Sequence, residues 1–311
     1  MGSVTTLAIL RGIAGLASLA TVMGLLARWS WLCELASHFC VQYVWILSLS
    51  GIALLILRQV PEGLFAISMA LLNLLAITPL HRRAPTRKAA RTYRALMANV
   101  LSGNQAHDKV HRLLRETQPD VVVLVEINER WLEALQPLTD TYTFTNHVLL
   151  PGGFGIVLLS RVPVERTQIV RLRATGLPLL VVGLMLQDQR VTIIGTHPVA
   201  PTNPFRTKHR NQHLADLAEF VLVQNRPTMV LGDLNTTSWS PGFQHLMRRA
   251  RLRDSRVGFG VQPSWPSMAP SPLRIPIDHC LVSHHIIVHQ RRIGPHIGSD
   301  HYPIIVDFSV L

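Results

Sequence analysis

An aspartate and a histidine stand side by side near the C-terminus, just before an apolar run. The segment 298–303 reads Gly-Ser-Asp-His-Tyr-Pro and is followed by Ile-Ile-Val at 304–306. The β-branched run predicts a buried strand, which can hold Asp300 and His301 at the rim of a sheet. Carboxylates and imidazoles are the groups that move protons and bind cations. Alone, however, an Asp-His pair is weak evidence for catalysis.

Similar polar residues stand at the ends of other apolar runs. They are Asn99, Glu126, His197, Asp233 with Asn235, and Asp278. The clearest case is Val121–Val125, a continuous apolar run typical of a strand that is covered on both faces, with Glu126 at its exit. Because so many strand ends carry a polar side chain, we expect them to meet at one site.

Six short motifs carry a family resemblance by their order and spacing. They are Ala-Asn-Val at 98–100, Val-Glu-Ile at 125–127, Gly-Thr-His at 195–197, Gly-Asp-Leu-Asn at 232–235, Ile-Asp-His at 277–279 and Ser-Asp-His at 299–301. The series resembles the endonuclease/exonuclease/phosphatase superfamily over roughly residues 91–311. It is most similar to the membrane-anchored bacterial branch, which includes relatives of the VanJ glycopeptide-resistance type. The resemblance implies a four-layered α/β sandwich of the DNase I type.

The resemblance also implies hydrolysis of a phosphate ester with Mg²⁺ or Mn²⁺ as cofactor. Such a reaction needs an in-line nucleophile and relief of charge on the phosphoryl oxygens. Glu126 and Asp300 are implied as metal ligands, because hard cations prefer carboxylate oxygens. His301 is implied as a general base or phosphate contact, with Asp278 fixing its tautomer.

The remaining implied roles concern the attacking water and the phosphate. Asp233 would position or deprotonate the water, Asn235 and His197 would donate to phosphate oxygens, and Asn99 would orient the metal site or Asp233. The chain departs from the family pattern at Leu101, where some members have a second acidic ligand, and at Ala98, where a Trp is common. The choice between one and two metal ions therefore stays open.

Three apolar segments precede the motifs, at Leu7–Ala27, Val41–Leu57 and Val60–Leu80. Each approaches the ~20 residues that a helix needs to cross a bilayer. We therefore expect an all-α region of three transmembrane helices at 1–80, a basic linker at 81–91 and the catalytic domain at 92–311. This is the pattern of a multi-pass protein of the cell (inner) membrane.

The basic residues fall into two clusters within a chain of net charge +12. One cluster comprises Arg82, Arg83, Arg87, Lys88, Arg91 and Arg94. By the positive-inside rule it would place the catalytic domain in the cytoplasm, whereas the resemblance implies an outward-facing domain, so the side stays open. The second cluster comprises Arg248, Arg249, Arg251, Arg253 and Arg256, and is either a solvated face or a phosphate-facing patch.

Apolar periodicity predicts the elements that position the motifs. Strands are expected at 93–100, 121–125, 141–148, 155–160, 164–170, 179–186, 191–196, 229–231, 277–282 and from 304, and helices at 108–116, 205–224 and 242–249. The polar residues of the helix at 205–224 are expected on its exposed face. A loop is expected at Gly258–Arg274, where Trp265 either forms a stacking or lipid-facing surface or folds onto the core. The three cysteines indicate no disulfide framework.

The leading hypothesis is a membrane-tethered phosphoesterase acting on a lipid-linked substrate, such as a phospholipid or polyprenyl phosphate. Tethering would confine the active site near the bilayer. A membrane-anchored nuclease acting on DNA or RNA is the alternative that the positive charge favours. A non-catalytic membrane scaffold is the third hypothesis, and the presence of every main catalytic residue type argues against it.

Overall fold

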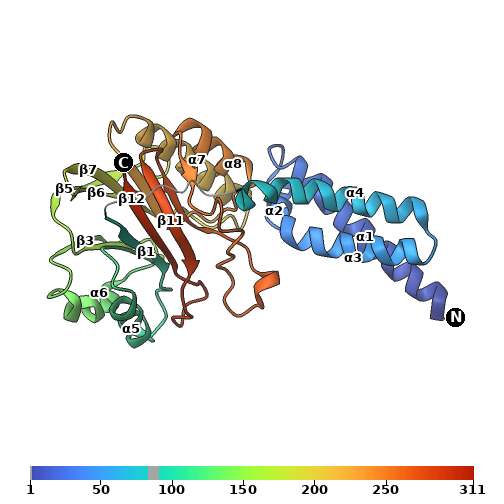
Figure 1. Ribbon diagram of the computed structural model, residues 1–311, viewed down its shortest axis with the longest axis horizontal. Coiled ribbons are helices and arrows are strands. Elements are labelled where there is room, and N and C mark those ends of the chain that lie inside the picture. Colours follow the sequence, from blue (N-terminus) through green and yellow to red (C-terminus); the bar gives the residue numbers. More distant parts are fainter. Residues whose placement is uncertain (1, 83–90) are drawn as a thin grey trace. The chain divides into compact units, whose positions relative to one another are not determined.

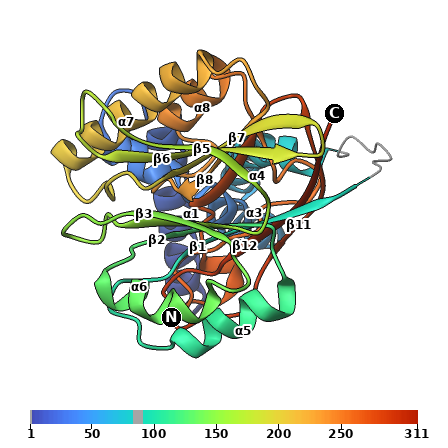
Figure 2. The same cartoon turned by 90° about the vertical axis from the view of Figure 1, so that its left-hand side faces the viewer.

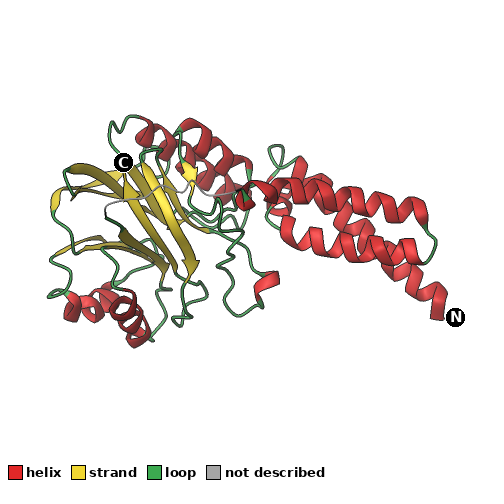
Figure 3. Cartoon of the chain, in the orientation of Figure 1, coloured by secondary structure: helices red, strands yellow, loops and turns green. Residues whose placement is uncertain are grey.

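A computed structural model describes residues 2–82 and 91–311. Two compact units are present: one comprises the chain up to Arg82 together with Trp239–Pro241, and the other comprises the rest. The first unit is helical and the second contains all the strands of the described chain (Figure 1, Figure 3). The basic residues Arg83, Arg87 and Lys88 lie outside the described residues.

The N-terminal unit consists of four α-helices and a short 3₁₀ helix. They are α1 (Gly2–Leu25), α2 (Trp31–Ser37), α3 (Cys40–Ile56), α4 (Val60–Ile77) and η1 (Thr78–His81). Two helical stretches are long and apolar enough to span a membrane, Thr5–Leu25 and Val60–His81. The third predicted span qualifies only if α2 and α3, which meet at 69°, count as one. At 17 residues α3 is about 26 Å long, short of a ~30 Å hydrocarbon core.

Small residues bring α3 and α4 together. A Cβ atom at Gly63 would lie 2.7 Å from the Leu55 side chain and 3.0 Å from the carbonyl oxygen of Gly51. A buried hydrogen bond from Asn73 Nδ2 to Thr21 Oγ1, 2.9 Å long, joins α4 to α1. Close backbone approach and interhelical hydrogen bonds are typical of helices packed in a membrane.

Two six-stranded mixed sheets form the second unit. The first has the order β11 (Ile286–Ile293), β12 (Ile304–Val310), β1 (Tyr93–Asn99), β2 (Val121–Val125), β4 (Ile156–Ser160), β3 (Phe144–Val148). The second has the order β5 (Val164–Arg171), β6 (Pro178–Leu186), β7 (Gln189–Thr196), β8 (Thr228–Asp233), β10 (Asp278–Val282), β9 (Arg253–Asp254). The sheets face each other across a core that includes Met97, Val123, Ile193, Leu231 and Phe308.

Helices cover the outer face of each sheet, so the unit has four layers (Figure 2). Helices α5 (His107–Thr117) and α6 (Glu129–Leu135) cover the first sheet, and α7 (Pro204–Leu222) and α8 (Pro241–Arg249) cover the second. Helix α5 shows why: Val110, Leu113 and Leu114 recur at helical spacing and are all buried. The expected α/β sandwich is confirmed.

Strand direction explains why the polar strand ends meet. Strand β1 is parallel to β2, and β7 is parallel to β8, so Asn99, Glu126, His197 and Asp233 all stand at carboxyl ends. Strand β10 is antiparallel to β8 and β12 is antiparallel to β1. The residues at the starts of β10 and β12, Asp278 among them, therefore reach the same edge of the sandwich.

The structure differs from the sequence-based expectations in several elements. Helix α6 and strand β11 were not predicted. On α7, Arg210 and His213 are completely buried, so the expectation that its polar residues lie on the exposed face is wrong for these two. Nor do the five arginines at 248–256 form one surface: Arg256 is buried against Asp254, whereas Arg249 pairs with exposed Glu219.

Candidate active site

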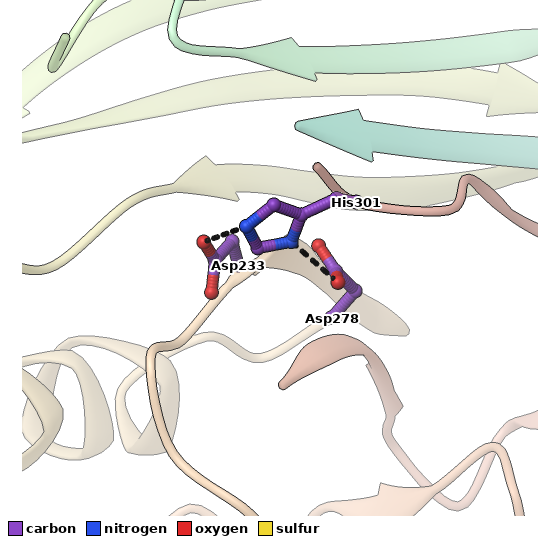
Figure 4. A group of neighbouring side chains, drawn as sticks. All are labelled: Asp233, Asp278 and His301. Carbon is purple, nitrogen blue, oxygen red and sulfur yellow. Dashed lines mark hydrogen bonds and ion pairs between the residues drawn. The ribbon is translucent and has the colours of Figure 1, made fainter. Parts of the chain in front are cut away.

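An imidazole lies between two buried carboxylates at the edge of the sandwich (Figure 4). Nδ1 of His301 lies 2.9 Å from Oδ2 of Asp278, and Nε2 lies 3.7 Å from Oδ2 of Asp233. Asp233 ends β8 and Asp278 begins β10, and the two residues are paired in register. Three chain segments distant in sequence thus meet at one ring.

The two carboxylates control the protonation of His301. Burial alone would lower the pKa of the imidazole, but the charges of Asp278 and Asp233 outweigh burial and raise it to about 10. Burial also raises the pKa of Asp233 to about 6, although the neighbouring His301 opposes the rise. For Asp278, burial acts upward, but the charge and hydrogen bond of His301 act more strongly and its pKa is lowered. At neutral pH the centre is an imidazolium between two ionised carboxylates.

Asn99 links this centre to Glu126. Its Nδ2 atom lies 2.8 Å from Oε1 of Glu126, 3.1 Å from Oδ2 of Asp233 and 3.4 Å from Nε2 of His301. A side-chain amide has two hydrogens, and a protonated imidazole accepts none, so both hydrogens go to the carboxylates. The amide is held in this orientation because its oxygen accepts from the backbone N–H of Leu101 at 3.0 Å.

Glu126 has the most accessible carboxylate of the cluster that Asn99 joins. The residue adopts φ +62°, an uncommon conformation for a non-glycine residue, directly after β2. Ser102 holds it: the hydroxyl donates to the backbone oxygen of Glu126 at 2.7 Å, and the N–H to Oε2 at 3.4 Å. The side chain is 22% exposed, whereas that of Asp233 is 2% exposed. Oε2 of Glu126 therefore accepts only one long hydrogen bond and can bind a ligand.

His197 and Asn235 complete the edge of the cluster. His197 lies 3.2 Å through Nδ1 from the backbone oxygen of Asp233, and 3.8 Å through Nε2 from Oε1 of Glu126. Asn235 adopts φ +50°, and its backbone N–H donates to Oδ1 of Asp233 at 2.9 Å. Its Nδ2 donates to the oxygen of Pro198 at 3.0 Å, which leaves a second hydrogen for a substrate oxygen.

Asp300 points toward a different neighbour. Its Oδ2 atom accepts from the indole Nε1 of Trp265 at 3.1 Å, and the Trp265 ring centre lies 6.4 Å from that of His301. The structure brings Asn99, Glu126, His197, Asp233, Asp278 and His301 into one contact network. Asp300 adjoins this network through Trp265, and its role as a metal ligand stays a prediction.

Two sets of residues are candidates for a cation. Asp233, Asp278 and His301 have ligand atoms within 4.8 Å of one another. In that set, however, the pKa of His301 is raised to about 10, so the imidazole holds both protons and offers a cation no lone pair. Glu126 fits a hard cation better, because its carboxylate is partly exposed and such ions keep water in the remaining positions.

Two supports behind the site were missed by sequence reasoning. Arg210 of α7 donates through Nη1 to the backbone oxygen of Asn235. His279 of β10 contacts the next carbonyl, with Nε2 2.7 Å from the oxygen of Thr236. His279 directly follows Asp278, and this Asp-His pair at the start of a strand was a sequence signal that could have identified it. The sequence around Arg210 gave no comparable signal.

A cavity of about 520 Å³ begins at the residue after Glu126. It is lined by Ile127, Asn128, Glu129, Arg130 and the loop at 149–151. None of the residues of the contact network lines this cavity.

The sequence matches the family model described as "Endonuclease/Exonuclease/phosphatase family" over residues 96–301. No curated protein sequence matches the chain.

Solved structures with the same fold are numerous but distant in sequence. An endonuclease/exonuclease/phosphatase from Bacteroides vulgatus is 17% identical, with a TM-score of 0.60 over 71% of this chain and 100% of that one. TDP2 of D. rerio, humanized by 14 mutations, is 15% identical, with a TM-score of 0.60 over 70% of this chain and 99% of that one. The human Nocturnin catalytic domain, solved with a bound sulfate anion, is 19% identical, with a TM-score of 0.55 over 71% of this chain and 95% of that one.

Proposed function

Because this chain belongs to the endonuclease/exonuclease/phosphatase family, we propose that it is a membrane-tethered, divalent-metal-dependent phosphoesterase. We divide it into an anchor at 1–80, a basic linker at 81–91 and a catalytic domain at 92–311. Members of the family are typically metal-dependent hydrolases of phosphate esters. The observation that carries the proposal is the placement of His301 between Asp278 and Asp233, with Asn99 joining the centre to Glu126.

In the proposed reaction, Asp233 takes a proton from the attacking water. With a pKa raised to about 6, it is ionised at neutral pH and more basic than an ordinary aspartate. The water oxygen bonds to phosphorus, the bond from phosphorus to the leaving oxygen breaks, and the proton goes to the Asp233 carboxylate. A buried base with a moderately raised pKa is suited to this step.

His301 acts in the same scheme as a cationic hydrogen-bond donor. With its pKa raised to about 10, the imidazole holds both protons at neutral pH and cannot be the base. Of the two roles that the family resemblance implies, we therefore assign it the phosphate contact, with Asp278 holding it in place. Asn235 donates to another phosphate oxygen, and His197 donates to a third through Nε2, which requires a hydrogen there in addition to the one on Nδ1 that faces the Asp233 carbonyl oxygen.

Glu126 and Asp300 would hold Mg²⁺ or Mn²⁺. When bound, the ion would neutralise charge on the phosphoryl and leaving oxygens. The partly exposed Glu126 carboxylate supports this assignment.

The experiment uses the purified full-length protein with a soluble phosphodiester and a soluble phosphomonoester. We expect turnover that requires Mg²⁺ or Mn²⁺, is lost with a chelator, and falls about 10²-fold or more in Asp233→Ala and His301→Ala. Asp140→Ala and His284→Ala, at exposed positions, are matched controls expected to keep the rate. Turnover that is absent, or unchanged by Asp233→Ala and His301→Ala, would favour the non-catalytic scaffold.

We propose a lipid-linked phosphate as the substrate, because two helices of this chain are long and apolar enough to span a bilayer. The runner-up is a nuclease, supported by the positive charge and by D. rerio TDP2, which was solved with a single-strand DNA product. Rates on polyprenyl pyrophosphate, phospholipid and DNA should be compared in the same preparation. Rapid DNA cleavage with inert lipids would replace our substrate assignment.

A multi-pass location in the cell (inner) membrane is part of the proposal. Reporter fusions after Leu311 test on which side the catalytic domain lies: an enzyme reporter active outside the cytoplasm indicates an outward-facing domain.

A further inference from the structure

The loop at Pro266–Arg274, termed here the apolar loop, exposes two large hydrophobic side chains beside the candidate active site. Met268 is 86% exposed and Leu273 is 59% exposed. The short 3₁₀ helix η3 (Ser271–Leu273) belongs to this loop and projects from the strands (Figure 1, short orange helix). Two large apolar side chains exposed on one short loop make it a candidate contact surface.

The one charged residue of the apolar loop turns inward. Arg274 donates through Nε to the oxygen of Ala269 at 2.6 Å and through Nη2 to that of Ser267 at 3.2 Å. Its guanidinium also lies 4.3 Å from the ring centre of Tyr302. The guanidinium of Arg274 therefore holds the base of the loop together, and the rest of the loop carries no charge.

Seven of the nine residues of the apolar loop leave no unpaired backbone N–H group. Three of its nine residues are prolines, which have no N–H group: Pro266, Pro270 and Pro272. Four others donate within the protein, as the N–H groups of Ser267, Ala269, Leu273 and Arg274 bond to carbonyl oxygens of Asp300, Pro266, Pro270 and Ser271. In the described chain only the N–H groups of Met268 and Ser271 in this loop make no such bond. Satisfied backbone groups are what an apolar medium demands, because no water is present there to pair them.

The base of the apolar loop is fixed to the segment that carries His301. The N–H of Ser267 donates to the oxygen of Asp300 at 2.7 Å, and its hydroxyl to that of Ser299 at 2.8 Å. Trp265, just before the loop, donates to the Asp300 side chain. Whatever binds Met268 and Leu273 is thus held at a fixed place relative to the imidazole.

We propose that the apolar loop inserts Met268 and Leu273 into a lipid bilayer and so presents the active site to phosphates at its surface. This inference rests on the proposed function and deepens it, by assigning the residues that recognise a lipid surface. A bilayer is favoured over a protein partner because the loop combines two exposed apolar side chains with few unpaired N–H groups and turns its one charged side chain inward. The same chain also carries helices able to span a membrane.

The length of the chain permits this contact. Nine peptide steps join Arg82 to Arg91, and an extended chain covers about 3.5 Å per step, so the reach is no more than roughly 30 Å. If α4 crosses a membrane, as proposed above, this tether limits how far the catalytic unit can move from that membrane. Such a tether would raise the effective concentration of the bilayer for an apolar surface of the catalytic unit.

Insertion is tested with a fluorophore at position 268 of the full-length protein in phosphatidylcholine vesicles. Met268→Cys is labelled with an environment-sensitive dye in a background in which Cys33, Cys40 and Cys280 are changed to Ala. Val223→Cys is the matched control, because Val223 is 69% exposed but directly follows α7, roughly 20 Å along the helix from Arg210, which supports the site. We expect nitroxide-bearing lipids to quench the dye at 268 several-fold more than the dye at 223.

An activity measurement gives the second readout. In Met268→Ser/Leu273→Ser, the ratio of the rate on vesicle phospholipid or polyprenyl pyrophosphate to the rate on a soluble ester should fall about tenfold. Val223→Ser should leave this ratio unchanged. An unchanged ratio in the double variant would overturn the proposal.

The outcomes separate this inference from the proposed function. If the dye at 268 is quenched by lipid while the wild-type protein hydrolyses no lipid phosphate, insertion stands and the substrate assignment fails. If lipid phosphates are hydrolysed while the dye at 268 is quenched only by aqueous iodide, insertion fails and the substrate assignment stands. If the dye at 268 becomes shielded from iodide only as the protein-to-lipid ratio rises, a second copy of the chain covers the loop. This result would also overturn the proposal.

Discussion

Asp233 and Asp278 lie directly opposite each other on the antiparallel strands β8 and β10. Like charges at opposed cross-strand positions repel each other, and both side chains are buried. The arrangement is tolerable because His301 contributes a positive charge to the pair. Three side chains from three segments therefore depend on one another for their charge states.

The first prediction concerns the proton on His301 in metal-free protein. Asp278→Asn removes the nearer carboxylate, so the pKa of His301 should fall from about 10 toward the ordinary value of ~6.5. NMR of histidine-labelled protein measures this pKa, with His301→Gln assigning the signal. An unchanged titration in Asp278→Asn would show that Asp278 does not hold the proton.

The same shift predicts how stability depends on pH. The folded-state pKa of His301 lies above the unfolded value. The stability that protonated His301 contributes to the folded state is therefore complete below about pH 6.5 and is lost as pH rises through about 10. For Asp233, the folded-state pKa is raised from 3.8 to about 6, so ionisation costs stability as pH rises through that window. The melting temperature of wild-type protein should therefore fall toward alkaline pH more than that of His301→Gln.

The second prediction concerns Asn99. Asn99→Leu keeps the branched shape of the side chain but removes both hydrogens that bind Glu126 and Asp233. The rate constant kcat on a soluble ester should fall about 10²-fold, the usual cost of losing a buried donor in an active site. Asn146→Leu, whose amide bonds Thr167 at the surface, is the matched control. A loss of less than about threefold in Asn99→Leu would assign Asn99 a structural role alone.

The strand-end residues were predictable because their signal is local. The five apolar residues of β2 and the polar Glu126 after them are adjacent in sequence, and a buried strand must end at a polar edge. The strand pairing was not predictable in this way. That Asp278 faces Asp233 depends on the register of β10 against β8, two strands more than forty residues apart.

Polar residues inside helices and strands were the main source of error. His213 and Arg210 look like an exposed face in sequence, yet His213 lies 2.7 Å from the Thr196 hydroxyl and Arg210 bonds Asn235. Burial of such residues is decided by a distant partner, which periodicity does not reveal. Strand β11 was missed for a related reason. Buried Arg291 and a bulge between Val288 and Gln290 interrupt the alternation of apolar and polar residues that identifies a strand.

The third prediction concerns His279 as a positioning residue. Arg256 only donates, so Nδ1 of His279, 3.2 Å from its Nη2, must accept, and Nε2 donates to the Thr236 oxygen. Burial, and then the Arg256 charge, lower the pKa of His279 to about 3, which keeps the ring neutral. His279→Phe should lower kcat about tenfold, because the backbone after Asp233 loses a fixed contact.

A glutamine distinguishes positioning from packing at this site. His279→Gln offers both a donor and an acceptor, so it should restore most of the kcat lost in His279→Phe, with KM similar in all three proteins. If His279→Gln and His279→Phe lower kcat equally while both keep the wild-type melting temperature, the hydrogen bonds of His279 do not position the Asp233 loop.

The fourth prediction tests the close contact that brings His197 and Asp233 together. A Cβ atom at Gly232 would lie 2.0 Å from the carbonyl oxygen of Thr196, so β7 and β8 must separate in Gly232→Ala. Overpacking of this kind costs about 3 kcal/mol, and the separation should also disrupt the site. Gly103→Ala is the control, since no atom lies within 4 Å of its Cβ position. Chemical unfolding should show a lowered midpoint for Gly232→Ala alone, and equal midpoints would mean that the strand ends are not held by this contact.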